Sequence, residues 1–558
     1  MDTDHRERQY FLFRIYLVTA FVVIFAGAIL LHLVKFQILE RAPTTRHLVI
    51  EEIPPKRGEI LDRNNFKIAY NHLGYLVYQR SRVPKDKVPV LRKYGIRVKN
   101  APGYWEKNPK LTLIAYDVSP EIKEKIFKIK GLYFRKAWFR SYTEPEIFEP
   151  LIGCVQKVSN AGLEGLEFQF DNYLRGVPGK IVYLVANKRD STKANRIRIP
   201  VPDSEIVAPV NGCNLVLTID QRIQTVAYEE VKKGVVEWHA RRGAAIVVNP
   251  STGEVLALAV YPSYDPEEYP TTPPSRKKVW PVTDPYEPGS IFKAITYGAA
   301  LTKGFSPAYP LDTDGGVIKV GKYRISDVHP LGKITLEDAL IHSSNVGTIK
   351  LAFRVGAKSI YNYIKKAGIG RKTGVSIPAE NPGKIQSYRK WDKTRFANVA
   401  IGYGFLLNSF HVVNIYSAIA NRGIIQKPRI LKSIVCGDTV KTVKSRSMGR
   451  LFPASACEKL TNILVKVVEK GTGRAARIEG VKIAGKTGTA NKLDPISRSY
   501  NRNRRIVSFV GFFPADNPEY LIYVVVDEPY KKGVEAYGGT VAAPIFKNIA
   551  NFILALKP

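Results

Sequence analysis

Near the N-terminus, 20 consecutive residues carry no Lys, Arg, Asp or Glu. They run from Ile15 to Val34, and this length of apolar chain spans the hydrocarbon core of a bilayer as a helix. The pattern predicts a transmembrane anchor at 15–34 after a short tail at 1–14. A cleavable signal peptide is the alternative, because Ala26-Gly27-Ala28 resembles a cleavage site. Apolar residues continue past Ala28, which favours an uncleaved anchor.

Beyond the anchor, mixed strand and loop patterns continue to about residue 205. Residues 53–71 alternate between apolar and polar positions, which predicts strands, and residues 62–65 (Asp-Arg-Asn-Asn) predict a turn. The proline-spaced stretch 197–212 then indicates a domain boundary. We therefore expect a mostly β domain at 41–205 and a second domain at 206–558.

The second domain combines helical and strand patterns. Asp220 is placed to cap a helix with apolar residues at every fourth position, and apolar runs at 244–249 and 254–260 flank a turn. The chain between this hairpin and residue 480 is mostly helical in pattern. Three further strands are expected at 481–490, 506–515 and 520–528. The expected fold class is α+β, an antiparallel sheet with helices packed on it.

Composition adds a strong positive charge to this picture. The chain has 85 Lys and Arg residues against 49 Asp and Glu residues, and its formal net charge of +36 is spread along the sequence. Such a field favours anionic partners. No zinc-finger spacing, basic-aromatic module or helix-turn-helix signal accompanies the charge. We therefore expect no nucleic acid partner and prefer anionic lipid or wall polymer.

Cysteine spacing gives no sign of metal binding. None of the four cysteines forms a CxxC pair or has a histidine partner at zinc spacing. They are Cys154, Cys213, Cys436 and Cys457. We expect no metal and no cofactor. A Cys436–Cys457 disulfide is one possibility in an oxidising compartment, and packed free thiols are the alternative that we favour.

A serine precedes an apolar helical run at 291–301. Pro288 and Gly289 interrupt the chain just before Ser290. Lys293 follows one turn later on the same helix face, where its amine can reach the serine hydroxyl. A serine becomes a good nucleophile when a base takes its proton, and a lysine can be that base if burial or nearby positive charge lowers its pKa. Alone, the pattern also fits an ordinary helix start with a serine cap.

Two further motifs follow this serine in order. Ser343 and Asn345 belong to an SxN triplet, and a KTG motif begins at Lys486 at the end of a predicted strand. Ser343 can relay a proton towards a leaving amine, and Asn345 can hold a substrate amide. Lys486 adds positive charge near a substrate carboxylate. The three motifs together predict acyl transfer with Ser290 as nucleophile.

The rest of the KTG strand is expected to bind substrate. It contains Thr487, Gly488 and Thr489. Gly488 lets the strand approach the substrate backbone closely. The amide hydrogens of Ser290 and Thr489 are expected to form an oxyanion hole.

The chain resembles the class B penicillin-binding proteins along most of its length. Matching segments lie in both predicted domains: RGEILDRN at 57–64, GLEGLEFQFDNYLRG at 162–176, LTID at 217–220, VNPSTGEVLALA at 248–259, YEPGSIFK at 286–293, SSNVGTIKLA at 343–352 and SFVGFFPADNPEY at 508–520.

This resemblance implies a single-pass protein of the cytoplasmic membrane. Residues 1–14 would lie in the cytoplasm, with an elongated, dimerisation-like pedestal domain at 41–205 outside it. The domain at 206–558 would have the penicillin-binding, serine β-lactamase-like fold. The implied activity is a D,D-transpeptidase that cross-links peptidoglycan stem peptides ending in D-Ala-D-Ala, and β-lactams would acylate Ser290.

Within the class, two segments look more like the division-type penicillin-binding protein 3 branch. They are residues 379–383 and 524–554. This implies septal wall synthesis beside a glycan polymerase of the SEDS type and other division proteins. An elongation role, as in the penicillin-binding protein 2 branch, is the alternative.

Two features depart from a simple match. Relatives commonly have Thr and Gln after a Gly-x-Gly segment, whereas here Gly402-Tyr403-Gly404 precedes Asn408, Ser409 and His411. This places local substrate contacts in doubt. The segment 492–505 after the KTG strand carries Lys492, Arg498, Arg502, Arg504 and Arg505. We interpret it as a solvated charged loop, with a substrate or partner contact as the alternative.

Two other function classes share some of these residues. A serine β-lactamase or carboxypeptidase would have the same five polar side chains but would release the acyl group to water. The sequence 458–462 comes near the Glu-x-x-Leu-Asn that activates this water in class A β-lactamases, but it fits a helix surface. A scaffold or antibiotic sensor is disfavoured because every nucleophilic element is intact.

Overall fold

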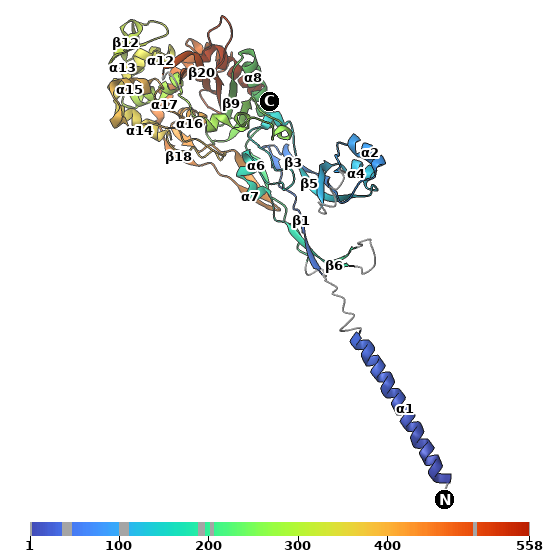
Figure 1. The fold of residues 1–558 in the computed structure, drawn as a ribbon. Helices are drawn as coiled ribbons and strands as arrows, with labels where there is room; N and C mark the ends of the chain where they lie inside the picture. The colour runs from blue at the N-terminus through green and yellow to red at the C-terminus, as the bar shows by residue number, and fades with distance from the viewer. Residues whose placement is uncertain are drawn as a thin grey trace. The chain divides into compact units, whose positions relative to one another are not determined.

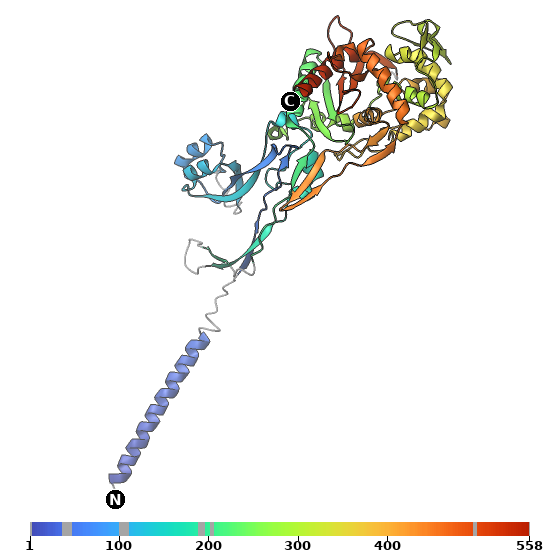
Figure 2. The same cartoon turned by 180° about the vertical axis from the view of Figure 1, so that it is seen from behind.

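The computed structural model describes residues 3–35, 47–99, 111–187, 196–200, 206–494 and 499–556. The chain divides into two compact units. One comprises Met1–Pro55 and Val177–Val210, and the other comprises Lys56–Gly176 and Asn211–Pro558. Figures 1 and 2 show the ribbon from opposite sides.

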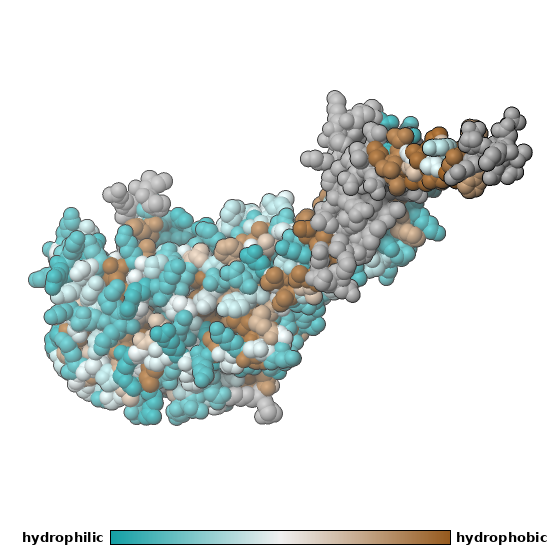
Figure 3. Space-filling view, turned by 90° about the horizontal axis from the view of Figure 1, so that it is seen from below, coloured by the Kyte–Doolittle hydropathy of each residue, from teal (hydrophilic) through white to brown (hydrophobic). Residues whose placement is uncertain are grey.

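The first unit contains the expected membrane anchor. Helix α1 (Thr3–Val34) includes the apolar segment Tyr10–Val34, which is long and apolar enough to cross a membrane. No part of this segment is buried, and its side chains give the brown, hydrophobic surface at the right of Figure 3. A helix that is apolar on every side is suited to lipid, so α1 fits a single-pass anchor.

The same unit holds a three-stranded antiparallel sheet. Its order is β1-β6-β7. The strands are β1 (His47–Ile53), β6 (Gly179–Asn187) and β7 (Arg196–Pro200). The predicted anchor and the start of the predicted pedestal therefore share one unit with a hairpin that follows much later in the sequence.

A seven-stranded sheet in the second unit joins segments from both predicted domains. Its order is β17-β16-β8-β2-β3-β4, with β5 also paired to β3. Its one parallel pair is β2 with β8. The strands are β2 (Ile60–Leu61), β3 (Lys67–Gln79), β4 (Thr112–Val118), β5 (Leu132–Tyr142), β8 (Asn214–Leu217), β16 (Leu431–Cys436) and β17 (Thr439–Thr442).

Short helices accompany the pedestal strands of this sheet. They are η2 (Lys85–Lys87), α2 (Val88–Lys93), α4 (Pro120–Ile126), α5 (Pro145–Phe148), α6 (Gly165–Gln169) and α7 (Asp171–Leu174). The mixed strand and loop pattern expected here is thus a sheet with short helical connections.

The predicted turn at 62–65 joins β2 to β3. Oδ1 of the buried Asp62 accepts the backbone N–H groups of Asn64 and Phe66 at 2.7 and 2.8 Å. Its Oδ2 accepts the N–H of Gln221 at 3.1 Å, at the start of helix α8 (Gln221–Glu237). One carboxylate therefore fixes both the turn and the first helix of the next domain. Asp220 caps that helix as predicted, accepting from the Arg222 N–H.

A buried ion network connects the segment just before β2 to β5, α6 and α7. Arg57 donates from Nε to Glu167 at 2.7 Å and from Nη1 to Asp171 at 2.7 Å, while Arg140 of β5 donates to Glu167 at 2.6 Å. The side chains of Arg57 and Glu167 are fully buried. Buried charges of this kind are tolerated when they are paired and hydrogen-bonded. The network explains why two distant family-like segments, 57–64 and 162–176, occur together.

The part of the second unit that contains the three motifs is built on a five-stranded antiparallel sheet. Its order is β10-β9-β21-β20-β19, which leaves β19 at an edge. The strands are β9 (Arg242–Val248), β10 (Val255–Tyr261), β19 (Ala484–Leu493), β20 (Tyr500–Phe513) and β21 (Tyr520–Asp527). All five lie where the apolar runs of the sequence predict strands.

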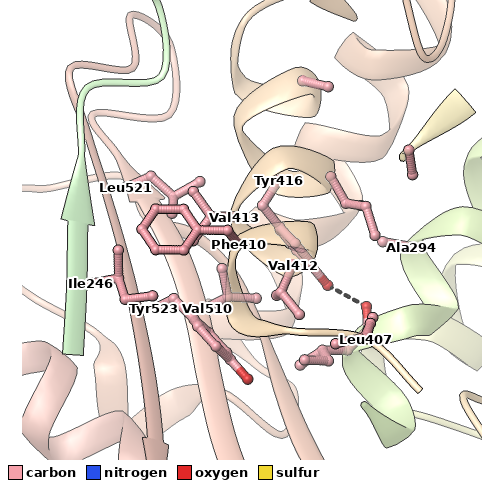
Figure 4. Packing of buried hydrophobic residues seen from close by; sticks show 14 of the residues in the cluster. Ile246, Ala294, Leu407, Phe410, Val412, Val413, Tyr416, Val510, Leu521 and Tyr523 are labelled. Carbon is pink, nitrogen blue, oxygen red and sulfur yellow. Dashed lines mark hydrogen bonds between the residues drawn. The ribbon is translucent and has the colours of Figure 1, made fainter. Parts of the chain in front are cut away.

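Helices cover both faces of this sheet. Ala245 and Val247 of β9 pack in one cluster with α8 and with α18 (Ala543–Ala555). Ile246 points the other way, towards α16 (Ser409–Ala420), whose Phe410 packs near it in Figure 4. Because both faces are buried, the central strands are continuously apolar rather than alternating.

Helices and small hairpins fill the chain between β10 and β19. The helices are α9 (Pro274–Lys277), α10 (Trp280–Thr283), α11 (Lys293–Thr302), α12 (Leu336–Ile341), α13 (Asn345–Val355), α14 (Ala357–Lys366), α15 (Lys393–Ala400), α16 and α17 (Ala454–Glu469). The paired strands are β11 (Pro310–Asp312) with β14 (Lys333–Thr335), β12 (Val317–Val320) with β13 (Tyr323–Ser326), and β15 (Ile424–Gln426) with β18 (Ser447–Arg450).

Single helical turns complete the fold. The 3₁₀ turns are η4 (Pro266–Glu268), η5 (Gly289–Phe292), η6 (Asp314–Gly316), η7 (Tyr388–Lys390) and η8 (Arg474–Ala476), and η9 (Gly538–Ala542) is a π-helical turn. The mostly helical character expected before residue 480 is confirmed.

The cysteines pair differently from both expectations. Cys213 and Cys436 form a disulfide across 223 residues of sequence, whereas Cys154 and Cys457 are buried free thiols. The suggested Cys436–Cys457 bridge is therefore wrong, and free thiols are correct for only two of the four cysteines. Cys436 is the last residue of β16. The residue before it, Val435, pairs with Asn214 of β8, which directly follows Cys213. This long-range strand pairing brings the two sulfur atoms together, and cysteine spacing cannot show it.

Candidate active site

Ser290 lies in the 3₁₀ turn η5, which leads directly into the buried helix α11. The sequence predicts this helix start. Gly289 has a φ of +62°, and a Cβ at this position would lie 2.7 Å from the carbonyl oxygen of Thr489. Glycine is therefore needed both for the backbone conformation and for close packing of the turn against β19. Ser290 itself is half-buried.

The Lys293 amine is fully buried beside the SxN motif. Its Nζ donates to the carbonyl oxygen of Ser343 at 2.6 Å and to Oδ1 of Asn345 at 2.8 Å, and lies 3.3 Å from Oγ of Ser343. The sequence predicts that this amine reaches the Ser290 hydroxyl. Among the described residues it makes no such hydrogen bond, and its contacts are with the SxN turn instead.

Lys486 approaches the Ser343 hydroxyl from strand β19. Its amine is also fully buried, lies 3.0 Å from Ser343 Oγ and donates to the Thr487 carbonyl oxygen at 3.1 Å. Ser343 has a φ of 57°, in the left-handed region. The structure therefore brings together Lys293, Ser343, Asn345 and Lys486, and places the Ser343 side chain between the two amines.

Burial changes the protonation of both lysines. Burial, and then the positive charge of Lys486, lower the pKa of Lys293 well below its usual value, while the negative charge of Asp327 opposes the change. Burial lowers the pKa of Lys486 to about 7. The lowered pKa favours the neutral amine of Lys293, which is the form that can accept a proton.

A neutral amine has two N–H donors and one lone pair. The two shortest contacts of Lys293, to Ser343 O and Asn345 Oδ1, use both donors. Its lone pair is then free to accept a proton from a hydroxyl. This arrangement suits a general base.

Gly488 lies opposite Ser508 in the pairing of β19 with β20. A Cβ at Gly488 would lie 2.4 Å from Ser508 Oγ and 2.8 Å from Ile291 Cγ2. Gly488 therefore lets β19 pack against the turn that carries Ser290. The expected close approach of the substrate backbone at this glycine stays a prediction.

The two threonines beside Gly488 are held by neighbouring segments. The hydroxyl of Thr487 is 2.8 Å from that of Thr472, and the hydroxyl of Thr489 accepts the N–H of Gly538 at 3.2 Å. These contacts fix the strand that the sequence assigns to substrate binding, and that assignment stays a prediction.

Sequence reasoning missed Asp327, which holds the SxN turn. Asp327 accepts from the Ser344 hydroxyl at 2.7 Å, from the Val346 N–H at 3.0 Å and from the Asn345 N–H. These groups form the N-terminus of α13, where a carboxylate is favourable. The only sequence signal is an aspartate just after a short strand pattern, and nothing in its spacing connects it to Ser343.

The residues after the Gly-x-Gly segment serve the fold. Asn408 caps α16 in a reciprocal pair with His411, and Ser409 Oγ is 3.0 Å from the Tyr286 hydroxyl. All three, Asn408, Ser409 and His411, are fully buried. Their contacts therefore stabilise the start of α16 behind the Gly-x-Gly segment.

The charged segment 492–505 is mostly strand rather than loop. Lys492 bridges Asp527 and Glu528 at 2.9 and 2.6 Å, and Arg504 also pairs with Glu528 at 2.8 Å. The expectation of a solvated loop is wrong for these residues, because their acidic partners lie at the end of β21 and are invisible in the local sequence. Two members of the segment lie outside the description: Arg498 and the side chain of Arg502.

The sequence 458–462 lies on α17, as expected for a helix surface. Glu458 and Asn462 are exposed. No contact of theirs reaches the lysine pair among the described residues, so the water-activating role known from class A β-lactamases finds no support.

Two family models match the chain. The penicillin binding protein transpeptidase domain matches residues 243–551. The penicillin-binding protein dimerisation domain matches residues 52–217. The first match includes the predicted catalytic residues, which are Ser290, Lys293, Ser343, Asn345 and Lys486.

Individual relatives cover most of the chain. It is 31% identical over 536 residues to the stage V sporulation protein D of Bacillus subtilis, with 92% of this chain and 80% of that protein covered. It is 31% identical over 455 residues to the peptidoglycan D,D-transpeptidase FtsI of Buchnera aphidicola, with 80% and 75% covered. Penicillin-binding protein 3 of Mycobacterium tuberculosis, solved with aztreonam, has a TM-score of 0.68 and 26% identity, covering 90% of this chain and 97% of that structure.

Proposed function

This chain belongs to the class B penicillin-binding proteins, and we propose that it cross-links peptidoglycan stem peptides through an acyl-enzyme on Ser290. The observation that carries this mechanism is the Ser343 hydroxyl between two buried lysine amines, 3.3 Å from Lys293 and 3.0 Å from Lys486. Such a pair can move a proton between a nucleophile and a leaving group.

The first half-reaction acylates the enzyme. Ser290 Oγ forms a bond to the carbonyl carbon of the penultimate D-Ala, and its proton passes to the neutral amine of Lys293. The peptide bond to the terminal D-Ala then breaks. The departing nitrogen takes a proton through the Ser343 hydroxyl, and free D-Ala leaves.

The second half-reaction transfers the acyl group to an amine. The amino group of a second stem peptide attacks the ester carbonyl and gives up a proton to the lysine and serine relay. Ser290 regains its proton as the ester bond breaks. One amide has replaced another, so no oxidant or reductant takes part.

The remaining site residues position the substrate in this mechanism. Lys486 and Thr487 attract the terminal carboxylate of the donor. The N–H groups of Ser290 and Thr489 stabilise the developing oxyanion. Asn345 holds a substrate amide with its side chain, which also accepts from Lys293 at 2.8 Å.

We place the catalytic domain outside the cytoplasmic membrane, with residues 1–14 inside. Two observations support this orientation. The substrate of the family is the cell wall, and a disulfide such as Cys213–Cys436 persists in oxidising compartments. Helix α1 then holds the enzyme at the membrane surface.

We further propose that the protein works in division, beside a membrane-embedded glycan polymerase of the SEDS type and other division proteins. The support is similarity to FtsI of Buchnera aphidicola and to a penicillin-binding protein 3. An elongation role is the competing assignment.

Labelled penicillin tests the acyl-enzyme. It should label the wild-type protein on the peptide that contains Ser290, and Ser290→Ala should give no label. Lys293→Arg keeps the positive charge but cannot readily act as a base, so it should lose labelling while thermal melting shows that the fold is kept. Label on a different peptide, or near-normal labelling of the arginine variant, would show that other groups carry the chemistry.

A further inference from the structure

A large cavity opens beside the turn that carries Ser290. Its volume is about 1460 Å³, and its wall includes Ala490–Leu493 of β19, Glu287 and Gly404. Ala490 directly follows Thr489, and Glu287 lies three positions before Ser290. The cavity therefore begins where the catalytic residues end.

Five cations line this cavity: Lys492 of β19, which is paired with Asp527 and Glu528, and four others from three separate segments. These four are Lys322 and Arg324 of the β12–β13 hairpin, Lys384, and Arg395 of α15. All four side chains are exposed. Within the described part of the chain, none of them is paired with a carboxylate. Four unpaired cations facing one cavity make it attractive to an anionic ligand.

The two carboxylates in the cavity wall, Glu287 and Asp392, already accept hydrogen bonds from other groups. Asp392 caps α15 and accepts the Arg395 backbone N–H at 2.6 Å. Glu287 accepts the N–H of Gly404 at 2.7 Å and the hydroxyl of Tyr500 at 3.0 Å. Neither carboxylate forms an ion pair with the four cations, so the positive charge of the wall is not cancelled by direct contact.

The course of strand β19 indicates which part of the substrate would lie in the cavity. Strand β19 is an edge strand, and an edge can pair with an extended peptide. The Tyr403 hydroxyl contacts this edge, 3.5 Å from the Thr489 carbonyl oxygen and 3.3 Å from the Asn491 nitrogen, and a bound peptide would replace these two long contacts. In the mechanism proposed above, the terminal carboxylate lies near Lys486 and the scissile carbonyl lies near Thr489. The peptide upstream of the scissile bond then continues along 490–493. Four strand residues extend about 13 Å, which is room for three or four peptide residues.

We propose that this cavity binds the upstream part of the donor stem peptide through its carboxylate groups, with Lys384 and Arg395 among the contacts. The inference rests on the proposed function, because the direction of the peptide depends on acylation at Ser290. It adds a specificity for acidic donors. The lysines and arginines of the wall recognise the carboxylate, and the catalytic lysines recognise the peptide end.

A pair of synthetic donors tests this specificity on the full-length protein in detergent. One is acetyl-Ala-Glu-Lys(acetyl)-D-Ala-D-Ala, and the other has Gln in place of Glu. Release of D-Ala should be faster from the Glu peptide by several fold, since each exposed ion pair changes affinity by roughly two- to fivefold. The double variant Lys384→Glu/Arg395→Glu should remove or invert this ratio, and the ratio cancels any general loss of activity.

Two controls separate this inference from the mechanism. Lys459→Glu reverses an exposed charge on α17, away from the cavity wall, and should keep the wild-type ratio. Raising the salt from about 0.05 M to about 0.5 M should lower the wild-type ratio without any substitution, because salt screens exposed charges.

The possible failures are distinguishable. Equal rates from both peptides with the wild-type protein, or an unchanged ratio in the double variant, would overturn the acidic specificity and leave the acyl-enzyme standing. A wild-type protein that benzylpenicillin does not label on Ser290 would overturn the proposed function and this inference with it.

Discussion

The Ser343 hydroxyl is shared by two buried amines whose pKa values are both lowered. It lies 3.0 Å from Lys486 Nζ and 3.3 Å from Lys293 Nζ. If Lys486 donates to the oxygen, the hydroxyl hydrogen is left to point towards the lone pair of Lys293. Burial lowers the pKa of both amines, and Lys486 lowers that of Lys293 further. The lowered pKa favours the neutral form of Lys293, and the shared hydroxyl connects this proposed base to the leaving-group side of the proposed reaction.

Asp327→Asn should shift the pH dependence of penicillin acylation. The negative charge of Asp327 raises the pKa of Lys293, so its removal lowers that pKa further. Acylation requires neutral Lys293, and the fall in rate on the acid side should therefore move to lower pH. Acylation rates measured across pH with labelled penicillin check this.

Asp338→Asn is the matched control for this shift. Asp338 also caps a helix, α12, through a reciprocal pair with Thr335, but its charge is not among those that act on Lys293. Its pH profile should coincide with that of the wild type. If Asp327→Asn lowers the rate equally at every pH, Asp327 has only a structural role in holding the SxN turn.

At the level of elements, helices and strands with a clear local pattern of apolar residues could be predicted from the sequence. The α8 helix, the β9–β10 hairpin and the three C-terminal strands all lie where apolar periodicity places them. The pairing of β8 with β16 could not be predicted, because it joins segments more than 200 residues apart and neither has a distinctive pattern. The Cys213–Cys436 bridge follows from that pairing and was missed for the same reason.

In the site, too, the motif residues could be predicted from the sequence, whereas their contacts with distant segments could not. Motif spacing predicts Ser290, Lys293, Ser343, Asn345 and Lys486, and the structure brings four of them into direct contact. It did not predict that Lys293 contacts the SxN turn in preference to the serine three residues before it. Nor did it predict Asp327, whose role depends on how the β12–β13 hairpin folds back on α13.

Cys213→Ser should destabilise the protein. The bridge closes a loop of more than 200 residues, and removing a native disulfide typically costs about 2–5 kcal/mol of stability. The double variant Cys213→Ser/Cys436→Ser should melt at the same temperature as the single variant. Calorimetry with and without a reductant checks this: reduction should lower the melting temperature of the wild type only. An unchanged wild-type melting temperature after complete reduction would show that the bridge adds no stability.

At the scale of the whole molecule, the chain combines a membrane helix with a catalytic domain that acts on the wall. The apolar segment of helix α1 is not buried against any part of the chain that the structure describes. An anchor of this kind would confine the proposed transpeptidase to wall close to the membrane, as the proposed role beside a glycan polymerase requires.

Depletion of the protein in its native cell should give filaments with blocked septa. The reason is that septal wall would lack cross-links while elongation continues. Microscopy of depleted cells with a fluorescent wall label measures this. Rounded cells that still divide would assign the enzyme to elongation, and complementation with Ser290→Ala separates loss of catalysis from loss of an assembly partner.

The sheet that crosses the predicted domain boundary limits how this protein can be recombined with its relatives. Strands β2 to β5 come from before the boundary, while β8, β16 and β17 come from after it. A chimera joined near residue 205 would pair three strands from one parent with four from the other. Exchange of the catalytic half therefore succeeds if β8 and β16 are taken from the same parent as the pedestal strands. It also succeeds if both parents have the same side chains where β8 pairs with β2.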